Sequence, residues 1–146
     1  MHIYEWREPH FRPVNSFYKQ QGHKGKANGT DRVFVLETDS QLLGAVRLVP
    51  FDGYYWLRSL QIAQTWQRQG LGIHMLTEIN QTVPENIYCF PYEHLQHFYE
   101  TAGYHVIKPE NCPENIRSLF TRYNSTGNKI LLMARVSASA EPAVLG

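Results

Sequence analysis

The feature that most constrains the fold of this sequence is an aliphatic, strand-like segment that leads through a glycine-rich turn into an amphipathic helix. It occupies residues 59–76 and reads SLQIAQTWQRQGLGIHML. A helix is expected from about Gly70 to Thr82, because its apolar side chains recur at helical spacing and share one face. The residues on that face are Leu71, Met75, Leu76 and Ile79. The segment therefore predicts a strand–turn–helix unit in which the glycines open the helix.

The turn has the composition of an anion-binding site. The first N–H groups of a helix have no intrahelical acceptor and lie at the positive end of its dipole. Gly70 and Gly72 have no Cβ atom, so a phosphate group can approach the backbone closely there. The side chains of Gln67 and Arg68 can add further hydrogen-bond donors. A phosphate-binding turn is the functional interpretation, and a helix that happens to begin with two glycines is the structural one.

Two other glycine motifs fit the turn poorly. A Walker A loop ends in GKS or GKT, and the sequence contains neither tripeptide. The dinucleotide-binding fingerprint needs a third glycine at the position of Met75. The turn therefore matches neither a P-loop nor a Rossmann-type nucleotide site.

Strand and helix patterns alternate along the rest of the chain. The first half is hairpin-like and the later half reads as strand–helix–strand, which indicates an α/β (α+β) fold with a mixed, mostly antiparallel sheet of six or seven strands flanked by helices. A length of 146 residues suits one domain, expected over residues 1–136, followed by a loose tail over residues 137–146. The expected strands are 3–6, 33–37, 42–49, 54–62, 87–90, 104–107 and 129–136, and the further helices cover 11–18, 93–103 and 113–123.

Two motifs in this order resemble the GNAT superfamily of N-acyltransferases. The pattern Q-x-x-G-x-G at residues 67–72, after an aliphatic strand, resembles the coenzyme A pyrophosphate loop of that family. The segment HFYETAGYHV, residues 97–106, resembles the family's F-Y-x-x-x-G-F/Y segment, which lies one strand and one helix further on. The strand order also matches across residues 3–136, so the resemblance covers nearly the whole chain.

The resemblance implies where acetyl-coenzyme A, the expected co-substrate, would bind. In this family the strand before the loop splays away from the next strand, which implies a V-shaped cleft between residues 54–62 and 86–91. Backbone groups along the splayed strand bind the pantetheine arm and the acetyl carbonyl, and N–H groups of the loop hold the pyrophosphate. The matching strand residues are Leu60, Gln61 and Ile62, and the matching N–H groups belong to Gln69, Gly70, Leu71, Gly72 and Ile73, with Gln67 and Arg68 beside them.

The same resemblance implies a catalytic role for Tyr99, which matches the tyrosine that protonates the departing coenzyme A sulfur. A Tyr hydroxyl, with a reference pKa near 10, can donate a hydrogen bond and then a proton to a thiolate, whose pKa is about 8.5. Tyr99 also lies on the apolar face of its expected helix, together with Leu95, Phe98 and Ala102. A buried core ring with a satisfied hydroxyl is therefore the structural interpretation of the same residue.

Other parts of the site stay open at the level of sequence. Many relatives carry Asn where this chain has Tyr92, so that cofactor contact is in doubt. The helix over 113–123 could cap the sheet, cover the acceptor or support a dimer. The loop His23–Thr30 is expected to form part of the acceptor wall. No single general base is identified, because Glu37, Glu85, Glu93 and the histidines all qualify.

Composition excludes several other classes of function. The net charge of +1 and the thinly spread Lys and Arg residues argue against a nucleic-acid partner. Cys89 and Cys112 form no disulfide framework, and His94 and His97 lack the further ligands of a metal site. The sequence has no apolar run near the ~20 residues of a membrane span, so a cytoplasmic protein without a membrane partner is expected.

The sequence thus predicts a metal-independent N-acetyltransferase, monomeric or homodimeric. It would move an acetyl group from acetyl-coenzyme A to a primary amine of a small molecule or peptide by direct attack in a ternary complex. The alternative is a non-catalytic acyl-coenzyme A-binding module with a sensing or regulatory role, which would keep the 67–72 loop and need no acid at Tyr99.

Overall fold

The strands form one open, mixed sheet of seven strands, which confirms the predicted fold class. The computed structural model describes residues 1–137. The strand order is β1-β2-β3-β4-β5-β7-β6. Of the pairs with a recorded register, β4–β5 is parallel, and β1–β2, β2–β3, β5–β7 and β6–β7 are antiparallel. The strands are β1 (His2–Glu5), β2 (Arg32–Thr38), β3 (Gln41–Pro50), β4 (Tyr54–Ile62), β5 (Asn86–Cys89), β6 (His105–Val106) and β7 (Met133–Arg135).

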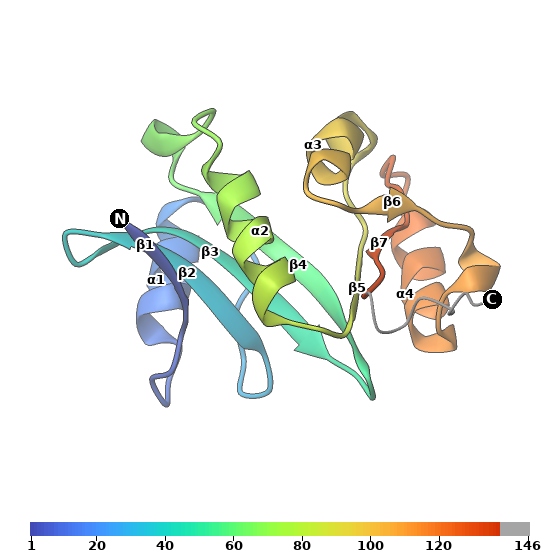
Figure 1. Cartoon of the computed structure of the whole chain (residues 1–146), viewed down its shortest axis with the longest axis horizontal. Coiled ribbons are helices and arrows are strands. Elements are labelled where there is room, and N and C mark those ends of the chain that lie inside the picture. The colour runs from blue at the N-terminus through green and yellow to red at the C-terminus, as the bar shows by residue number, and fades with distance from the viewer. Residues whose placement is uncertain (138–146) are drawn as a thin grey trace. The chain divides into compact units, whose positions relative to one another are not determined.

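The chain divides into two compact units. The first contains residues 1–50 and 57–83, and the second contains residues 51–56 and the chain from Pro84 onward. In the first unit, α1 (Arg12–Gln20) and α2 (Leu71–Thr82) lie on opposite faces of the strands (Figure 1). Both helices begin close to their predicted positions, because the apolar spacing that predicts them is the spacing that packs them on the sheet.

Alternation along the strands separates the two faces of the first unit. Val33, Val35 and Ala45 join Val14, Phe17 and Tyr18 of α1 in one buried cluster. On the other face, a Cβ atom added to Gly44 would lie 2.9 Å from Ile62 Cδ1 and 3.0 Å from Met75 Sδ. A side chain at position 44 would have to displace the ends of Ile62 and Met75, so glycine lets α2 pack closely on β3 there. The start of α2 is therefore placed by packing next to the end of β4.

The second unit packs aromatic side chains against its own short strands. α3 (Gln96–Thr101) follows a 3-10 turn over Glu93–Leu95, and α4 (Glu114–Asn124) lies further along the chain. Phe90 contacts Trp56, Phe120 and Tyr123 with ring centroids 5.2, 5.4 and 6.2 Å away. These rings pack α4 against Trp56 of β4 and against Phe90, which follows β5, within the same unit.

The last strand is shorter than predicted. The expected strand covered residues 129–136, whereas β7 has only Met133–Arg135. The Leu131 N–H donates to the carbonyl of Pro91 (2.8 Å), and the carbonyl of Lys129 accepts from Glu93 N–H (3.0 Å). Pro91 has no backbone N–H and cannot donate a hydrogen bond to the last strand. The regular ladder, which pairs Cys89 with Met133, is therefore interrupted at Pro91.

Two further expectations concern the chain end and membranes. Most of the tail expected over residues 137–146 lies outside the described residues. Ser137, its first residue, is buried, and its N–H donates to Asn86 Oδ1 at 2.8 Å. Within the described part of the chain, no helix combines the length and the apolar character that a membrane span needs.

Candidate functional site

The turn between β4 and α2 gathers backbone N–H groups. A 3-10 turn over Gln64–Trp66 follows β4, and then Arg68 and Gly70 adopt left-handed backbone conformations with φ of 66° and 79°. Successive residues of opposite hand form backbone nests, whose N–H groups converge on an anion, and left-handed Gly70 leads directly into the right-handed helix at Leu71. A left-handed φ is strained for Arg68, and strain of this kind is typical of ligand-binding turns.

The N-terminus of α2 has no side-chain cap. Gly70 is the N-cap residue, no side chain accepts a hydrogen bond from the first turn, and the first turn carries no acidic residue. His74 N–H donates to Gly70 O at 3.1 Å, so the N–H groups of Leu71, Gly72 and Ile73 precede the first helical hydrogen bond. A Cβ atom built on Gly70 would meet no other atom within 4 Å. The helix start therefore offers donors, positive dipole and space, as the sequence predicts.

The side chains predicted beside the turn divide into two kinds. Gln67 Nε2 donates to the carbonyl of Ile62 at 2.9 Å, and Gln61 Nε2 donates to the same carbonyl at 3.2 Å. Gln67 thus ties the turn back to β4 in addition to any contact that it makes with an anion. Arg68 and Gln69 are exposed to solvent. The structure brings residues 60–62 and 67–73 together in one region of the first unit.

The second half of β4 departs from a regular strand just before the predicted acyl-binding residues. Ser59 has a left-handed φ of 61°, and its carbonyl accepts a hydrogen bond of 2.7 Å from the Tyr18 hydroxyl. Leu60, Gln61 and Ile62 follow and are half-buried. The registered ladder between β4 and β5 covers Tyr54–Trp56 and Asn86–Tyr88, and β4 continues beyond it. Ser59 thus marks a break in β4 that the sequence pattern does not reveal.

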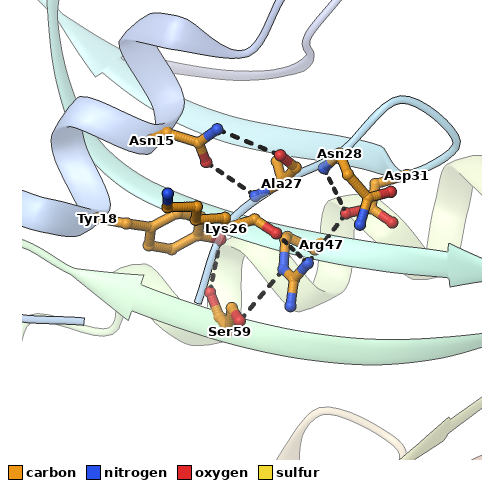
Figure 2. A network of polar contacts seen from close by, with 8 residues as sticks. All are labelled: Asn15, Tyr18, Lys26, Ala27, Asn28, Asp31, Arg47 and Ser59. Atoms are coloured by element: carbon orange, nitrogen blue, oxygen red, sulfur yellow. Dashed lines mark hydrogen bonds and ion pairs between the residues drawn. The ribbon is translucent and has the colours of Figure 1, made fainter. Parts of the chain in front are cut away.

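A buried ion pair holds Ser59 from the other side (Figure 2). Arg47 of β3 is 4% exposed and Asp31 is 8% exposed. Arg47 Nη1 lies 3.1 Å from Asp31 Oδ2, and Arg47 Nε donates to Ser59 Oγ at 3.2 Å. Arg47 Nη1 also donates to the carbonyl of Lys26. One guanidinium therefore joins β3, β4 and the loop after α1, and its charge is balanced by a carboxylate.

The same network fixes the loop at residues 23–31, as Figure 2 shows. Asn15 of α1 uses both ends of its amide: Nδ2 donates to Ala27 O at 3.2 Å, and Oδ1 accepts from Ala27 N–H at 2.8 Å. Asn28 N–H donates to Asp31 Oδ2 at 3.1 Å. Sequence reasoning predicted this loop but missed its anchors. The available signal was Arg47, a charged residue inside an otherwise apolar strand run.

Tyr99 lies in the second unit, on α3, as the motif predicts. It is 7% exposed, and its ring is held between Phe98 and Tyr104 at centroid distances of 5.1 and 5.7 Å. Burial raises the pKa of the Tyr99 hydroxyl far above its ordinary value, and the nearby Cys89 raises it further. The hydroxyl is therefore protonated at neutral pH, which is the form that can donate.

Tyr92 and a metal site are two further points that the sequence raises. Tyr92, which replaces the family's Asn, is 52% exposed and stacks on His94 with ring centroids 6.0 Å apart. Among residues 1–137, no group of three His, Cys, Asp or Glu side chains could hold a metal ion.

Comparison with known proteins identifies the domain type. Residues 29–106, more than half of the chain, match the family described as "Acetyltransferase (GNAT) domain". That range includes β2–β5, the turn before α2 and Tyr99. No curated protein matches the sequence significantly.

Solved structures with similar folds share little sequence with this chain. An aminoglycoside 6′-N-acetyltransferase complexed with coenzyme A is 14% identical, with a TM-score of 0.67 over 92% of this chain and 96% of that one. A GNAT family acetyltransferase from Elizabethkingia anophelis with acetyl-CoA bound is 13% identical, with a TM-score of 0.61 over 93% and 97%. N-acetylglutamate synthase from Neisseria gonorrhoeae, complexed with coenzyme A and N-acetyl-glutamate, is 17% identical with a TM-score of 0.66; 92% of this chain spans only 35% of the synthase.

Proposed function

The chain belongs to the acetyltransferase (GNAT) domain family, and from this premise we propose that it is an N-acetyltransferase. It moves the acetyl group of acetyl-coenzyme A to a primary amine on a small molecule or peptide. The observation that carries the proposal is the uncapped, left-handed turn at the start of α2, which lies where the family's pyrophosphate loop falls in this sequence.

The residues at this turn fit the pyrophosphate of coenzyme A. The donors are the N–H groups of Gln69–Ile73, and the open space at Gly70 lets a diphosphate approach the backbone. The missing acidic residue in the first turn of α2 leaves the dipole uncompensated, which favours a dianionic group. The exposed Arg68 adds a cation next to these donors.

β4 binds the reactive half of the co-substrate in this proposal. Leu60, Gln61 and Ile62 offer backbone groups to the pantetheine arm and the acetyl carbonyl. The Ile62 carbonyl already accepts from two glutamine side chains, which holds this end of β4 in one conformation. The V-shaped opening between β4 and β5 stays a prediction.

Tyr99 acts as the acid that protonates the leaving thiolate. Support comes from its match to the family's tyrosine. Burial raises the pKa of Tyr99, so the hydroxyl is protonated and can donate a hydrogen bond to the sulfur as charge develops there. The rings of Phe98 and Tyr104 restrict its motion. Tyr99 is a donor positioned before the reaction, so it costs little reorganisation when sulfur charge develops.

The state of the two cysteines favours direct attack by the amine over a route through an acetylated cysteine. Cys89 is buried, and burial raises the pKa of its thiol far above the ordinary value. Burial likewise raises the pKa of Cys112. A thiol held protonated in this way is a poor nucleophile, so neither cysteine is suited to carry the acetyl group.

The proposal is tested by turnover rather than by binding alone. Purified protein is incubated with acetyl-coenzyme A and a panel of amines that includes amino acids, polyamines, aminoglycosides and peptide N-termini, and release of free coenzyme A is followed. Amine-dependent release supports the proposal. Tight binding of acetyl-coenzyme A without release across the panel would instead indicate the sensing or regulatory module.

A further inference from the structure

His23 occupies a constrained position at the end of α1. Its backbone N–H donates to the carbonyl of Tyr18 at 2.9 Å, which ends the helix. Its ring packs on the ring of Tyr18 with centroids 5.0 Å apart. Because the Tyr18 hydroxyl also donates to Ser59 O, one tyrosine positions both His23 and the irregular residue of β4. The His23 side chain is half-buried, so its position is fixed while solvent can still reach it.

Gly25 shows which atom of the ring faces β4. A Cβ atom built on Gly25 would lie 2.7 Å from His23 Nε2 and 2.8 Å from Ser59 Oγ. The imidazole nitrogen and the serine hydroxyl therefore converge on one point beside Ser59. Any side chain at position 25 would displace one of them, since the contact is closer than a real Cβ allows. Ser59 directly precedes Leu60–Ile62, the proposed acyl-binding segment.

The charges around His23 favour its neutral form. Burial lowers the pKa of His23 first, and the positive charges of Arg47 and Arg58 lower it further. The carboxylate of Asp31 is committed to Arg47 and to the Asn28 N–H, and Lys24 and Lys26 flank Gly25 in the loop. At neutral pH the ring is therefore an uncharged base, close to the Arg47–Asp31 ion pair and to Arg58.

We propose that His23 is the general base that takes the proton from the acceptor amine before it attacks the acetyl carbonyl. The role rests on the proposed acetyl transfer. The carrying observation is geometric: His23 Nε2 and Ser59 Oγ lie 2.7 and 2.8 Å from the Cβ position of Gly25, and Ser59 directly precedes the strand residues proposed to hold the carbonyl. A base must act within hydrogen-bond reach of the attacking nitrogen, directly or through one water, so the proposal requires the amine to bind beside Ser59.

The ammonium group, His23 and Tyr99 exchange protons during the transfer. His23 Nε2 takes one proton from the ammonium group, and the neutral nitrogen forms a bond to the acetyl carbonyl carbon. The carbon–sulfur bond breaks, and the sulfur leaves with the bonding electron pair and receives the Tyr99 proton. The nitrogen loses its second proton to solvent, from which Tyr99 is reprotonated. His23 releases its proton to solvent when the N-acetyl product leaves.

The first test compares His23→Gln with wild type on an amine that the panel identifies. We expect kcat/KM for the amine to fall about 10²-fold or more at pH 7, with unchanged affinity for acetyl-coenzyme A by calorimetry. For wild type, kcat/KM should rise with pH, with an inflection below the ordinary histidine pKa. The His23→Gln variant should lack this inflection. The difference in kcat/KM between the variant and wild type should become smaller as the pH approaches the pKa of the amine, because the amine then loses its proton to solvent. His105→Gln, at an exposed residue of β6, is the matched control and should behave as wild type.

A second measurement does not depend on how the variant folds. An NMR titration of the imidazole resonances of wild-type protein should give His23 a pKa below the ordinary value of histidine. If wild type turns over an amine and the His23→Gln variant has the same rate and pH profile, the role of His23 is overturned but the acetyl transfer is not. A His23 pKa above the ordinary histidine value, which would leave the ring largely charged at neutral pH, overturns it too. A wild-type protein that turns over no amine in the panel overturns the acetyl transfer and the base together.

Discussion

The two glycine-containing loops of the first unit differ in how side chains hydrogen-bond to their backbone groups. In the turn before α2, no side chain caps the helix start, and space remains around Gly70. In the loop at residues 23–31, Asn15, Asp31 and Arg47 bind the backbone of Ala27, Asn28 and Lys26. The first loop leaves the start of α2 without a side-chain cap, while the second uses its backbone groups in hydrogen bonds to α1, β3 and Asp31. Glycine content alone does not distinguish a binding turn from a rigid one.

The largest effect should follow from breaking the anchored loop. Arg47→Met leaves the Asp31 carboxylate buried without its cation, which costs about 3–5 kcal/mol of unfolding free energy. Adding Asp31→Asn removes the uncompensated charge, so the double variant should recover much of that loss. Urea unfolding of the two single variants and the double variant measures the coupling. Single variants within about 0.5 kcal/mol of wild type would show that the pair does not hold the loop.

The next effect concerns chemistry rather than folding. Tyr99→Phe keeps the ring between Phe98 and Tyr104 and removes one oxygen. If the hydroxyl protonates the leaving sulfur, kcat should fall about 10²-fold or more while affinity for acetyl-coenzyme A barely changes. Stopped-flow turnover and calorimetry on the same sample separate the two quantities. Wild-type turnover would remove Tyr99 from the mechanism, and loss of the folded state would assign it to the core.

A smaller effect sharpens the contrast between the two loops. Asn15→Ala removes both hydrogen bonds to Ala27 and should cost about 1–2 kcal/mol of stability. The loosened loop should raise KM for the amine severalfold and leave the affinity for acetyl-coenzyme A unchanged, because the turn before α2 does not use it. Steady-state kinetics with each substrate varied separately provides the measurement. Equal loss of both affinities would mean that the two loops are not independent.

The sequence predicts the regular elements well and the long-range contacts poorly. β4 has the predicted bounds, Tyr54–Ile62, because alternation and flanking turns are local signals. The left-handed φ of Ser59 and its bonds to Tyr18 and Arg47 depend on residues 41 and 12 positions away, which no local pattern encodes. The shortened final strand depends on Pro91, which lies in a different segment and has no N–H to donate to the strand. The sequence shows this proline but not that it pairs with the last strand.

The candidate site divides in the same way. The uncapped helix start at Gly70 is predictable because a helix start and its glycines are contiguous in sequence, and anion binding there stays a prediction. Tyr99 is found through a motif, and burial alone would place it in the core. His23 is one of seven histidines in the sequence, and only its contacts with Tyr18, Gly25 and Ser59 distinguish it. Residues whose roles depend on tertiary neighbours therefore escape a reading of the sequence.

The central claim is that the turn before α2 binds the pyrophosphate of coenzyme A, and calorimetric titration with acetyl-coenzyme A tests it most directly. Gly72→Asp and Gln69→Asp place a carboxylate among the N–H donors, and Thr77→Asp places the same charge on an exposed position further along α2 as a control. Gln69 is exposed, so its variant should fold normally. We predict that wild type and Thr77→Asp bind with similar affinity, and that both turn variants lose at least about tenfold, or 1.4 kcal/mol. Absence of binding by wild type at millimolar ligand, or turn variants that bind as tightly as wild type, would contradict the account.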